Sequence, residues 1–340
     1  MSTISKQNIC KNILMVDGYS ASGKGLLCHF LETFNKVSKM QVSHLYNQIA
    51  ILDYLKFINR PASLDFLNMQ IDMSFHSDLL GRDTNYRFVD DSSVFKSRKF
   101  LKYFFRSISH SKKNIHKIIE EENPTFLIMN HFTSAHTEFY FEALGPRLKY
   151  INIEKHPVYL FPHWTKIFQK ILDNDPLMYQ FILNLNGKKH MWFDTENAFN
   201  DNVYDFIIQS MVRLDKISKK KRITENNTNN YLNICFEKFV TNIFHYNGKI
   251  ERFLNLNSTT STKRFIKKNK LNKKYLHDRK WKHTYFGWKL EENLETKKKY
   301  FDKLNFIKKK CSKDNFQNLI KLCKNYENKF GLKFPNTNNF

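Results

Sequence analysis

Short apolar runs alternate with amphipathic helical patterns along the first two thirds of the chain. Each apolar run has the length of a buried strand. On this basis we expect six strands: Asn12–Val16, Met40–Tyr46, Phe126–Met129, Lys149–Ile153, His190–Phe193 and Tyr231–Phe236. Apolar residues at helical spacing predict helices over Gly23–Phe34, Ser63–Leu80, Lys99–Glu122, Ser134–Leu144, Pro157–Leu172 and Val203–Ile217.

Strands that alternate with helices indicate βαβ units and a mostly parallel sheet that is covered on both faces. We therefore predict a three-layer α/β domain over residues 1–257. Beyond that point Lys and Asn dominate, with helical patterns near Glu292–Lys309 and Asp314–Lys329. We interpret residues 258–340 as a basic helical extension or lid.

The loop after the first expected strand has the pattern of a phosphate-binding loop. It precedes a helix and reads Gly18-Tyr19-Ser20-Ala21-Ser22-Gly23-Lys24-Gly25. Glycines let successive backbone N–H groups turn inward, and the N-terminus of the helix adds partial positive charge. Lys24 then reaches the oxygens of a bound phosphate. This motif predicts a fold like that of P-loop NTPases, although a chance glycine-rich turn has the same composition.

Two positions argue against a firmly held magnesium ion at this loop. A nucleoside triphosphatase normally has Ser or Thr directly after the lysine, and its hydroxyl binds Mg²⁺. Gly25 occupies that position here, and the strand Phe126–Met129 ends in Asn130-His131 rather than in an Asp. We therefore expect a loop that holds phosphate without a tightly bound metal, and we assign no metal ligand.

A second junction between a strand and a helix offers another cation at the same edge of the sheet. The strand Lys149–Ile153 runs into Glu154-Lys155-His156-Pro157, and Pro157 opens a helix. In an open parallel sheet, ligands gather at the carboxyl ends of the strands. Two anion sites on one edge suit a nucleotide with phosphates at two separate positions. The alternative is that His156-Pro157 only begins the helix and that Lys155 is solvated.

With these motifs in this order, the chain resembles the sulfotransferase family that uses 3′-phosphoadenosine 5′-phosphosulfate (PAPS). The resemblance extends in pieces from residue 12 to residue 257. Its later part is the segment Asn233–Phe239 (NICFEKF), which precedes an amphipathic helix ending in Phe253-Leu254-Asn255-Leu256. The resemblance implies a transferase that moves a sulfuryl group from PAPS to a hydroxyl or amine.

The resemblance also implies roles for individual residues. It places the 5′-phosphosulfate in the loop Gly18–Gly25 and the 3′-phosphate at Lys155, with a further binding residue near His163. Sulfuryl transfer needs a base for the acceptor proton and a cation for the leaving phosphate. His131 is the expected base and Lys24 the expected cation. The other interpretation of His131 is an ordinary residue that caps the following helix.

Three positions depart from the pattern of this family. The family has Lys or Arg at the position of Ala21, Thr or Ser at that of Lys24, and Arg at that of Lys155. With its Lys24-Gly25 ending, the loop also resembles that of nucleotide kinases of the cytidylate type. A kinase that uses ATP with magnesium is therefore the second hypothesis. A non-catalytic protein that binds nucleotides or polyanions is the third.

Two charged segments have both a functional and a simple structural interpretation. The block Lys263–Lys274 either closes over the nucleotide, with Arg264 reaching a phosphate, or is a solvated basic tail. Asp90-Asp91-Ser92-Ser93, in the loop Gly81–Arg98, either positions an acceptor or a cation, or only begins a helix. The acceptor is expected to be a carbohydrate or a small molecule.

The charge of the chain favours anionic partners without selecting one. The formal net charge is +24, from 56 Lys and Arg against 32 Asp and Glu. Phosphorylated cofactors, nucleic acid and membrane surfaces are all attracted by such an excess. The lysines are spread over many segments, however, and a general bias toward Lys, Asn, Ile and Phe also explains them. We expect an anionic nucleotide donor and no nucleic-acid partner.

The remaining composition indicates a cytoplasmic protein. The five cysteines are scattered and form no Cys-x-x-Cys pair, which argues against a zinc site or a disulfide framework. No run of eighteen apolar residues occurs, and the first apolar run is too short for a signal peptide. We therefore expect no membrane span.

Overall fold

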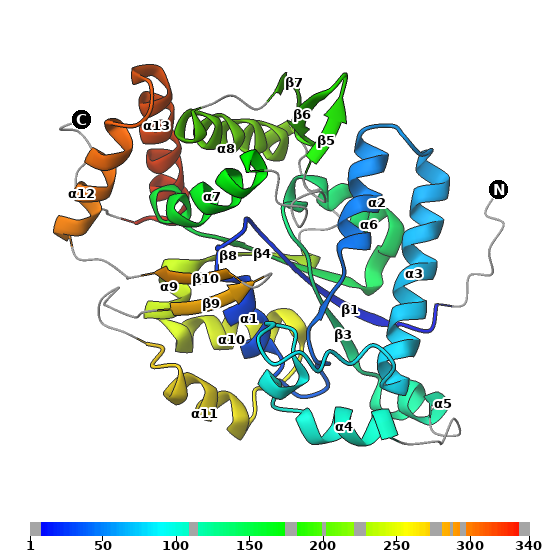
Figure 1. The fold of residues 1–340 in the computed structure, drawn as a ribbon. Coiled ribbons are helices and arrows are strands. Elements are labelled where there is room, and N and C mark those ends of the chain that lie inside the picture. The colour runs from blue at the N-terminus through cyan, green and yellow to red at the C-terminus, as the bar shows by residue number, and fades with distance from the viewer. Residues whose placement is uncertain are drawn as a thin grey trace.

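The computed structural model describes residues 8–108, 115–173, 182–198, 202–220, 229–272, 281–285, 288–292 and 297–332. Its centre is a five-stranded sheet with the order β2-β3-β1-β4-β8, and every pair of neighbours is parallel (Figure 1). The strands are β1 (Asn12–Asp17), β2 (Gln41–Val42), β3 (Thr125–Met129), β4 (Leu148–Glu154) and β8 (Tyr231–Cys235). The predicted α/β fold with a mostly parallel sheet is confirmed.

The strands are continuous apolar runs because helices cover both faces of the sheet. In β1, every residue from Ile13 to Asp17 is buried. Leu14 and Val16 face one core, whereas Ile13 and Met15 face another, as the two-residue period of a strand requires. The sheet is thus the middle of three layers.

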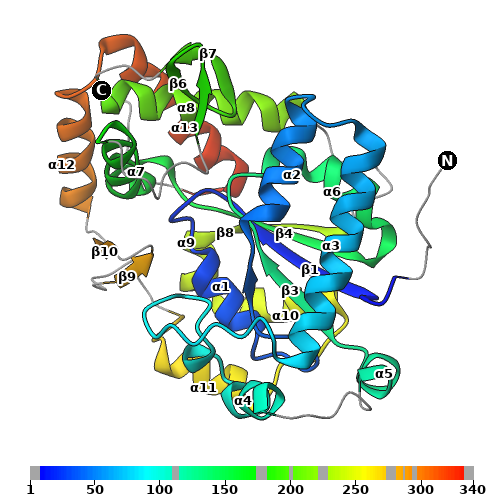
Figure 2. The same cartoon turned by 45° about the vertical axis from the view of Figure 1, so that its right-hand side comes forward.

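Each face of the sheet has its own set of helices (Figures 1 and 2). The face of Leu14 packs against α1 (Lys24–Leu31), α9 (Phe236–Thr241), α10 (Ile243–Leu254) and α11 (Thr260–Lys268). The face of Ile13 packs against α2 (His44–Tyr54), α3 (Arg60–Leu80) and α6 (Thr137–Leu144). A further helix, α4 (Phe100–Ile108), follows a long irregular loop and contacts α3.

A third core lies beyond the carboxyl ends of the strands. It contains buried residues of α7 (Pro157–Leu172), α8 (Val203–Lys220), α12 (Lys297–Lys308) and α13 (Lys313–Phe330). Trp164 of α7 is fully buried in this core, and its ring contacts those of Phe132 and Phe168. The C-terminal helices α12 and α13 therefore share a core with α7 and α8. The predicted division between residues 257 and 258 stays a prediction.

Three expectations of secondary structure were wrong in part. The strand expected over Met40–Tyr46 is only Gln41–Val42, because the chain turns at Ser43 and α2 begins at His44. The pattern His190–Phe193 belongs to a separate antiparallel sheet of β5 (Ile182–Leu185), β6 (Lys188–Met191) and β7 (Asp194–Ala198).

The helix expected over Lys99–Glu122 is divided into α4, α5 (Ile115–Lys117) and a π-helical turn at Ile118–Glu122, with residues 109–114 outside the described part. A second small sheet pairs β9 (Trp281–Tyr285) with β10 (Trp288–Glu292) in antiparallel fashion. All five cysteines are free thiols. Among the residues that the structure describes, no helix is both long enough and apolar enough to cross a bilayer.

Truncating Leu319 of α13 to Ala is expected to destabilise the whole protein by about 2–5 kcal/mol, because its side chain is fully buried in the third core. Urea unfolding followed by tryptophan fluorescence and by far-UV circular dichroism would measure the change. The exposed Lys321→Ala on the same helix is the control, with a change within about 0.5 kcal/mol. An early partial transition in Leu319→Ala, with an unchanged main transition, would instead mean that the C-terminal helices form a separable extension.

Candidate functional site

Three segments converge at the carboxyl edge of the parallel sheet. β1 ends at Asp17 and continues into the loop Gly18–Gly23, which leads to α1. β3 ends beside it and is followed by Asn130 and His131, and β4 ends in Glu154 followed by Lys155. Backbone hydrogen bonds join the segment after β1 to the segment after β3. Asn130 N donates to Val16 O at 2.8 Å, and Phe132 N donates to Gly18 O at 3.3 Å. The structure thus brings most of the sequence-predicted site residues to one edge.

The loop depends on its glycines for both conformation and space. Gly18 has a φ of 147° and Gly23 a φ of 99°, which are values that favour glycine. A Cβ on Gly18 would lie 2.2 Å from Ile153 O of β4, and a Cβ on Gly23 would lie 2.3 Å from the ring of Phe236. Between them Ala21 adopts a φ of 67°, which is unusual for a residue with a side chain. The loop is therefore tightly curled and packed against β4 and the start of α9.

The opening of α1 offers hydrogen-bond donors to an anion. Gly23 is the N-cap residue, and no side chain caps the helix. The first amides of a helix have no acceptor within the helix. The hydroxyl of Ser22 is also buried, with no hydrogen-bond partner in the described structure. A buried polar atom of this kind usually has a partner, so Ser22 and the nearby amides fit a bound oxyanion.

The side chain of Lys24 lies inside the loop and hydrogen-bonds to its backbone. This side chain is buried, and its ammonium donates to Gly18 O at 2.7 Å and to Tyr19 O at 2.8 Å. An ammonium has three protons, so one remains for an anion. Burial lowers the pKa of Lys24 to about 8, although the nearby carboxylate of Asp17 raises it. Lys24 is thus charged at neutral pH and loses its charge in mildly alkaline solution.

Asp17 joins the three segments through its buried carboxylate. Its Oδ1 accepts from Gly18 N at 2.5 Å. Its Oδ2 accepts from Thr133 N at 3.1 Å, from the Thr133 hydroxyl at 2.6 Å and from the Tyr150 hydroxyl at 2.8 Å. Burial raises the pKa of Asp17, while the Lys24 ammonium and these donors lower it in part. The carboxylate fixes the direction in which the loop leaves β1.

Lys155 lies beside the loop, and one aromatic ring separates the two. The side chain of Lys155 is buried, with Nζ 5.2 Å from the centroid of the Phe236 ring. The same ring would touch a Cβ on Gly23. Next along the chain, His156 N donates to Glu237 Oε1 at 3.0 Å, and this fixes the turn that carries Lys155. Two cations, Lys24 and Lys155, therefore flank one corner of the sheet edge.

His131 lies close to Lys24 in a dry environment. Its ring is buried and stacks on His44 of α2, with centroids 5.8 Å apart. Burial lowers the pKa of His131 well below its usual value, and the charges of Lys24, His44 and His163 lower it further. The imidazole is consequently neutral at pH 7 and able to accept a proton, although it is a weaker base than a histidine in water.

Helix α7 holds the tip of the loop. His163 Nε2 and the Ser20 hydroxyl are hydrogen-bonded at 2.6 Å, and Trp164 Nε1 donates to Ser20 O at 3.2 Å. Tyr19 packs against the rings of Phe132 and Trp164, with centroids 6.1 and 5.6 Å away. The structure therefore places His163 against the loop, where it orients Ser20.

Two sequence-predicted positions have different surroundings from those expected. Arg264 is exposed on α11, which contacts the far end of α1 through a 2.9 Å hydrogen bond between Thr33 and Thr262. Figures 1 and 2 show α11 at the end of the molecule opposite α7, so the structure does not bring Arg264 to the loop. At Gly25, a Cβ would lie 3.2 Å from Oδ2 of Asp91, which puts a carboxylate beside the start of α1.

Sequence reasoning missed several residues that shape this site. Asp17 carries a signal, because it is the only charged residue of its strand and follows four apolar residues. Phe236 and Glu237 lie in the segment singled out in the sequence, but nothing local shows that they contact Gly23 and His156. His44 lies within a segment predicted as a strand. Among the described residues, no three His, Cys, Asp or Glu side chains form a group that would hold a metal ion.

Comparison with known proteins finds likeness only among solved structures. No family model and no curated protein matches the chain. The sulfotransferase domain from the curacin biosynthetic pathway aligns with a TM-score of 0.45 at 12% identity, over 95% of this chain and 99% of that one.

Two further neighbours give similar values. The sulfotransferase domain of the Synechococcus PCC 7002 olefin synthase aligns with a TM-score of 0.44 at 12% identity, over 95% of this chain and 96% of that one. Sulfotransferase STF9 from Mycobacterium avium aligns with a TM-score of 0.44 at 11% identity, over 96% of this chain and 78% of that one. At these scores the likeness is one of approximate chain path and assigns no activity to this chain.

Replacing Asp17 by Asn is expected to destabilise the protein by about 2–4 kcal/mol in urea unfolding. The amide removes the cost of burying a charge, but its NH₂ group would face hydroxyl and amide groups that already donate to Asp17. The exposed Asp302→Asn serves as a control and should change stability by no more than about 0.5 kcal/mol. A loss below about 1 kcal/mol in Asp17→Asn would show that the carboxylate does not organise the loop.

Proposed function

We propose that this chain is a sulfotransferase-like enzyme that binds PAPS at the carboxyl edge of its sheet. The observation that carries the proposal is that two cationic positions lie on either side of one aromatic ring. We call them the loop corner (Gly18–Lys24) and the Lys155 corner. Phe236 packs on Gly23 of the phosphate loop, and Lys155 lies over the same ring. A nucleotide with a 5′-phosphosulfate and a 3′-phosphate needs two cationic positions of this kind.

The loop corner fits the 5′ group. The uncapped start of α1, the unpartnered Ser22 hydroxyl and the third proton of Lys24 are all available to oxyanion oxygens. Gly25 leaves α1 without the hydroxyl that binds magnesium in nucleoside triphosphatases. These features suit a donor that is bound through amides and a lysine rather than through a metal ion.

The Lys155 corner fits the 3′-phosphate. Its ammonium is held by the Phe236 ring, and the turn behind it is fixed by Glu237. A lysine binds phosphate as a point charge and lacks the two-pronged geometry of arginine. We therefore expect the charge of the 3′-phosphate to be recognised more strictly than its orientation.

The residues around His131 suit proton removal from an acceptor. When bound, the donor supplies the activated sulfuryl group. His131 is neutral because it is buried beside a cation, and it would accept the proton of the acceptor hydroxyl or amine. Lys24 holds positive charge at the phosphate loop, where negative charge develops on the leaving side. The acceptor, a carbohydrate or a small molecule, stays a prediction.

A kinase that uses ATP with magnesium is the second candidate, and Asp91 favours it. Its carboxylate lies beside Gly25, close to the position of the hydroxyl that binds magnesium in nucleoside triphosphatases. In the structure this carboxylate is paired with Lys96 Nζ at 3.2 Å. Without a metal ion, Asp91 would repel a phosphate at the start of α1. The two candidates thus predict opposite effects of removing its charge.

Lys155→Met is expected to weaken the binding of 3′-phosphoadenosine 5′-phosphate by about tenfold or more, since one charge-assisted contact is worth about 1.5–3 kcal/mol. Adenosine 5′-phosphate, which lacks the 3′-phosphate, should bind both proteins with affinities within about twofold. Isothermal titration without magnesium would measure this difference. Lys166→Met, at an exposed position on α7, is the matched control.

The same titration separates the two candidates. For a sulfotransferase, 3′-phosphoadenosine 5′-phosphate binds without magnesium, and Asp91→Asn strengthens that binding. For a kinase, ATP binds only with magnesium, and Asp91→Asn weakens it. No binding of 3′-phosphoadenosine 5′-phosphate at millimolar concentration would reject the proposal.

The affinity for 3′-phosphoadenosine 5′-phosphate should fall as the pH rises above about 8. Burial lowers the pKa of Lys24 to about 8, and the anion favours its charged form. Binding above this pKa therefore requires proton uptake, and affinity decreases by up to about tenfold per pH unit. Titrations between about pH 7 and pH 9.5 would test this.

Lys24→Met is the control for this pH profile, because burial also lowers the pKa of Lys99 to about 8. The variant keeps Lys99 and loses Lys24. Its affinity for 3′-phosphoadenosine 5′-phosphate should therefore be lower and should not change with pH over the same range. A profile in Lys24→Met with the wild-type slope would assign the titration to another group.

A further inference from the structure

Exposed apolar side chains gather on the loop Gly81–Lys99 and on the outer side of α4. Eight large apolar side chains are exposed there, and we call six of them the aromatic patch: Phe88, Phe95, Leu101, Phe104, Phe105 and Ile108. Phe88, Leu101 and Phe105 are 70%, 64% and 60% exposed. Single exposed apolar residues are ordinary, but a group of this size marks an interaction site.

The patch is continuous from the loop to the helix. Phe88 stacks on Phe95 with centroids 4.4 Å apart, and Phe95 stacks on Phe100 at 5.3 Å. Phe100 in turn contacts Phe104 at 5.8 Å, and Phe104 contacts Phe105 at 5.9 Å. The rings of two segments therefore form one surface.

Helix α4 is held by its inner side and presents the patch outward. Tyr103 is buried beneath it, where its hydroxyl accepts from Lys39 N at 2.8 Å and donates to Asp78 Oδ2 at 3.2 Å. Leu101 and Phe105 are four residues apart, as are Phe104 and Ile108, so these four residues share one helical face. The buried contacts of Tyr103 on the inner face of α4 therefore fix the orientation of its exposed face.

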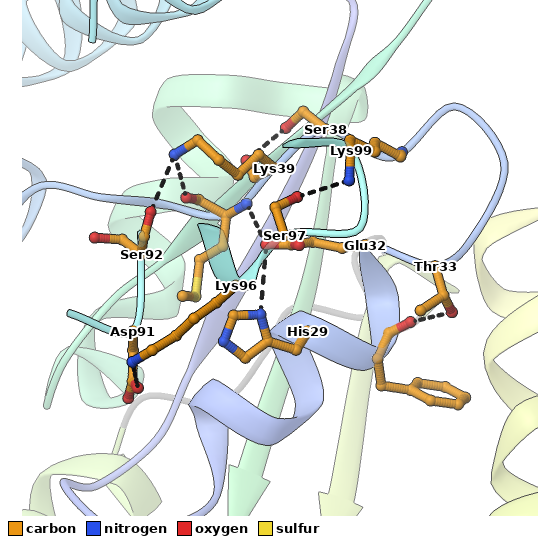
Figure 3. Close-up of polar contacts among 12 residues, drawn as sticks. His29, Glu32, Thr33, Ser38, Lys39, Asp91, Ser92, Lys96, Ser97 and Lys99 are labelled. Carbon is orange, nitrogen blue, oxygen red and sulfur yellow. Dashed lines mark hydrogen bonds and ion pairs between the residues drawn. The ribbon is translucent and has the colours of Figure 1, made fainter. Parts of the chain in front are cut away.

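Polar contacts also fix the loop (Figure 3). Lys39 Nζ donates to Ser92 O at 3.3 Å, and Lys96 pairs with Asp91 at 3.2 Å. Behind them, Glu32 of the α1 end accepts from Met40 N at 2.8 Å and pairs with His29 at 3.7 Å. The patch is thus preorganised, which lowers the entropic cost of binding a partner.

The segment that carries the aromatic patch has an excess of positive charge. The segment Gly81–Ile108 contains seven Lys and Arg against three Asp, and Arg82, Arg87, Arg98 and Lys102 are exposed. An amphipathic helix with aromatic and aliphatic side chains on one face and basic residues around it is typical of attachment to a lipid surface. A second copy of this chain would bring together two surfaces of the same charge, which is unfavourable. The rings stack on one another and are mixed with Leu and Ile, unlike the free ring faces on which nucleic-acid bases stack.

We propose that the aromatic patch binds the surface of a bilayer that contains anionic phospholipids. The rings and aliphatic side chains enter the level of the lipid headgroups, and the surrounding Arg and Lys side chains contact lipid phosphates. The same loop carries Asp91, which lies beside Gly25 at the start of α1. The membrane-facing surface and the candidate site therefore share one segment, although this proposal does not depend on the identity of the nucleotide.

Co-sedimentation of the full-length protein with lipid vesicles tests the proposal. We expect at least tenfold stronger partition to phosphatidylcholine vesicles with about 30% phosphatidylserine than to pure phosphatidylcholine, in about 0.1 M salt. The variant Phe88→Ser/Leu101→Ser/Phe105→Ser should lose at least tenfold of this binding, and Arg87→Gln/Lys102→Gln at least threefold. Unchanged melting temperatures would show that the variants fold.

Exposed phenylalanines elsewhere provide a matched control. Phe57 and Phe244 are 62% and 61% exposed outside the patch, and Phe57→Ser/Phe244→Ser should bind vesicles within twofold of the wild type. The proposal is overturned if the protein binds neither kind of vesicle, or if the patch variant and this control lose binding equally. It is also overturned if the patch variant only dissociates a dimer in size-exclusion chromatography, or only loses binding to a single-stranded oligonucleotide.

Discussion

The buried carboxylate of Asp17 is the constraint on which the candidate site depends. It stands at the end of the central strand and accepts hydrogen bonds from the first residue of the loop, from Thr133 after β3 and from Tyr150 on β4. These donors come from three segments that no short-range interaction would bring together. A buried charge is costly unless it is fully hydrogen-bonded and compensated, and Lys24 supplies the compensating charge from the other side of the loop.

A second polar group extends this organisation to the C-terminal helix. Glu237 follows Phe236 directly and accepts hydrogen bonds from His156 N and from the hydroxyl of Tyr326 on α13. The same hydroxyl lies 3.2 Å from Glu154 O, at the end of β4, so its one proton is shared between the two acceptors. The turn that carries Lys155 is therefore enclosed between α9 and α13. The C-terminal helix contributes to the position of Lys155 even though it lies far away in the sequence.

The sequence predicted the central strands and the loop well, because both are local patterns. Buried parallel strands such as Phe126–Met129 are continuous apolar runs, and Gly18–Gly25 is a short motif between a strand and a helix. Contacts between distant segments could not be predicted. The partners of Asp17 are 116 and 133 residues away, and the buried stripe of α13 is hidden among lysines and asparagines.

Charged groups lie at both ends of helix α1, and this links the site to the aromatic patch. Lys24 lies at the start of the helix, close to Asp17. His29 and Glu32 form an ion pair at its end, where Glu32 also accepts a hydrogen bond from Met40 N. Burial lowers the pKa of His29, but its hydrogen bond and ion pair with Glu32 raise it overall. Ser97, in the loop that carries the patch, lies close enough to this second group to help lower the pKa of Glu32. Buried ion pairs rarely add stability, so their concentration around one short helix is better explained by the need to hold two loops in defined positions.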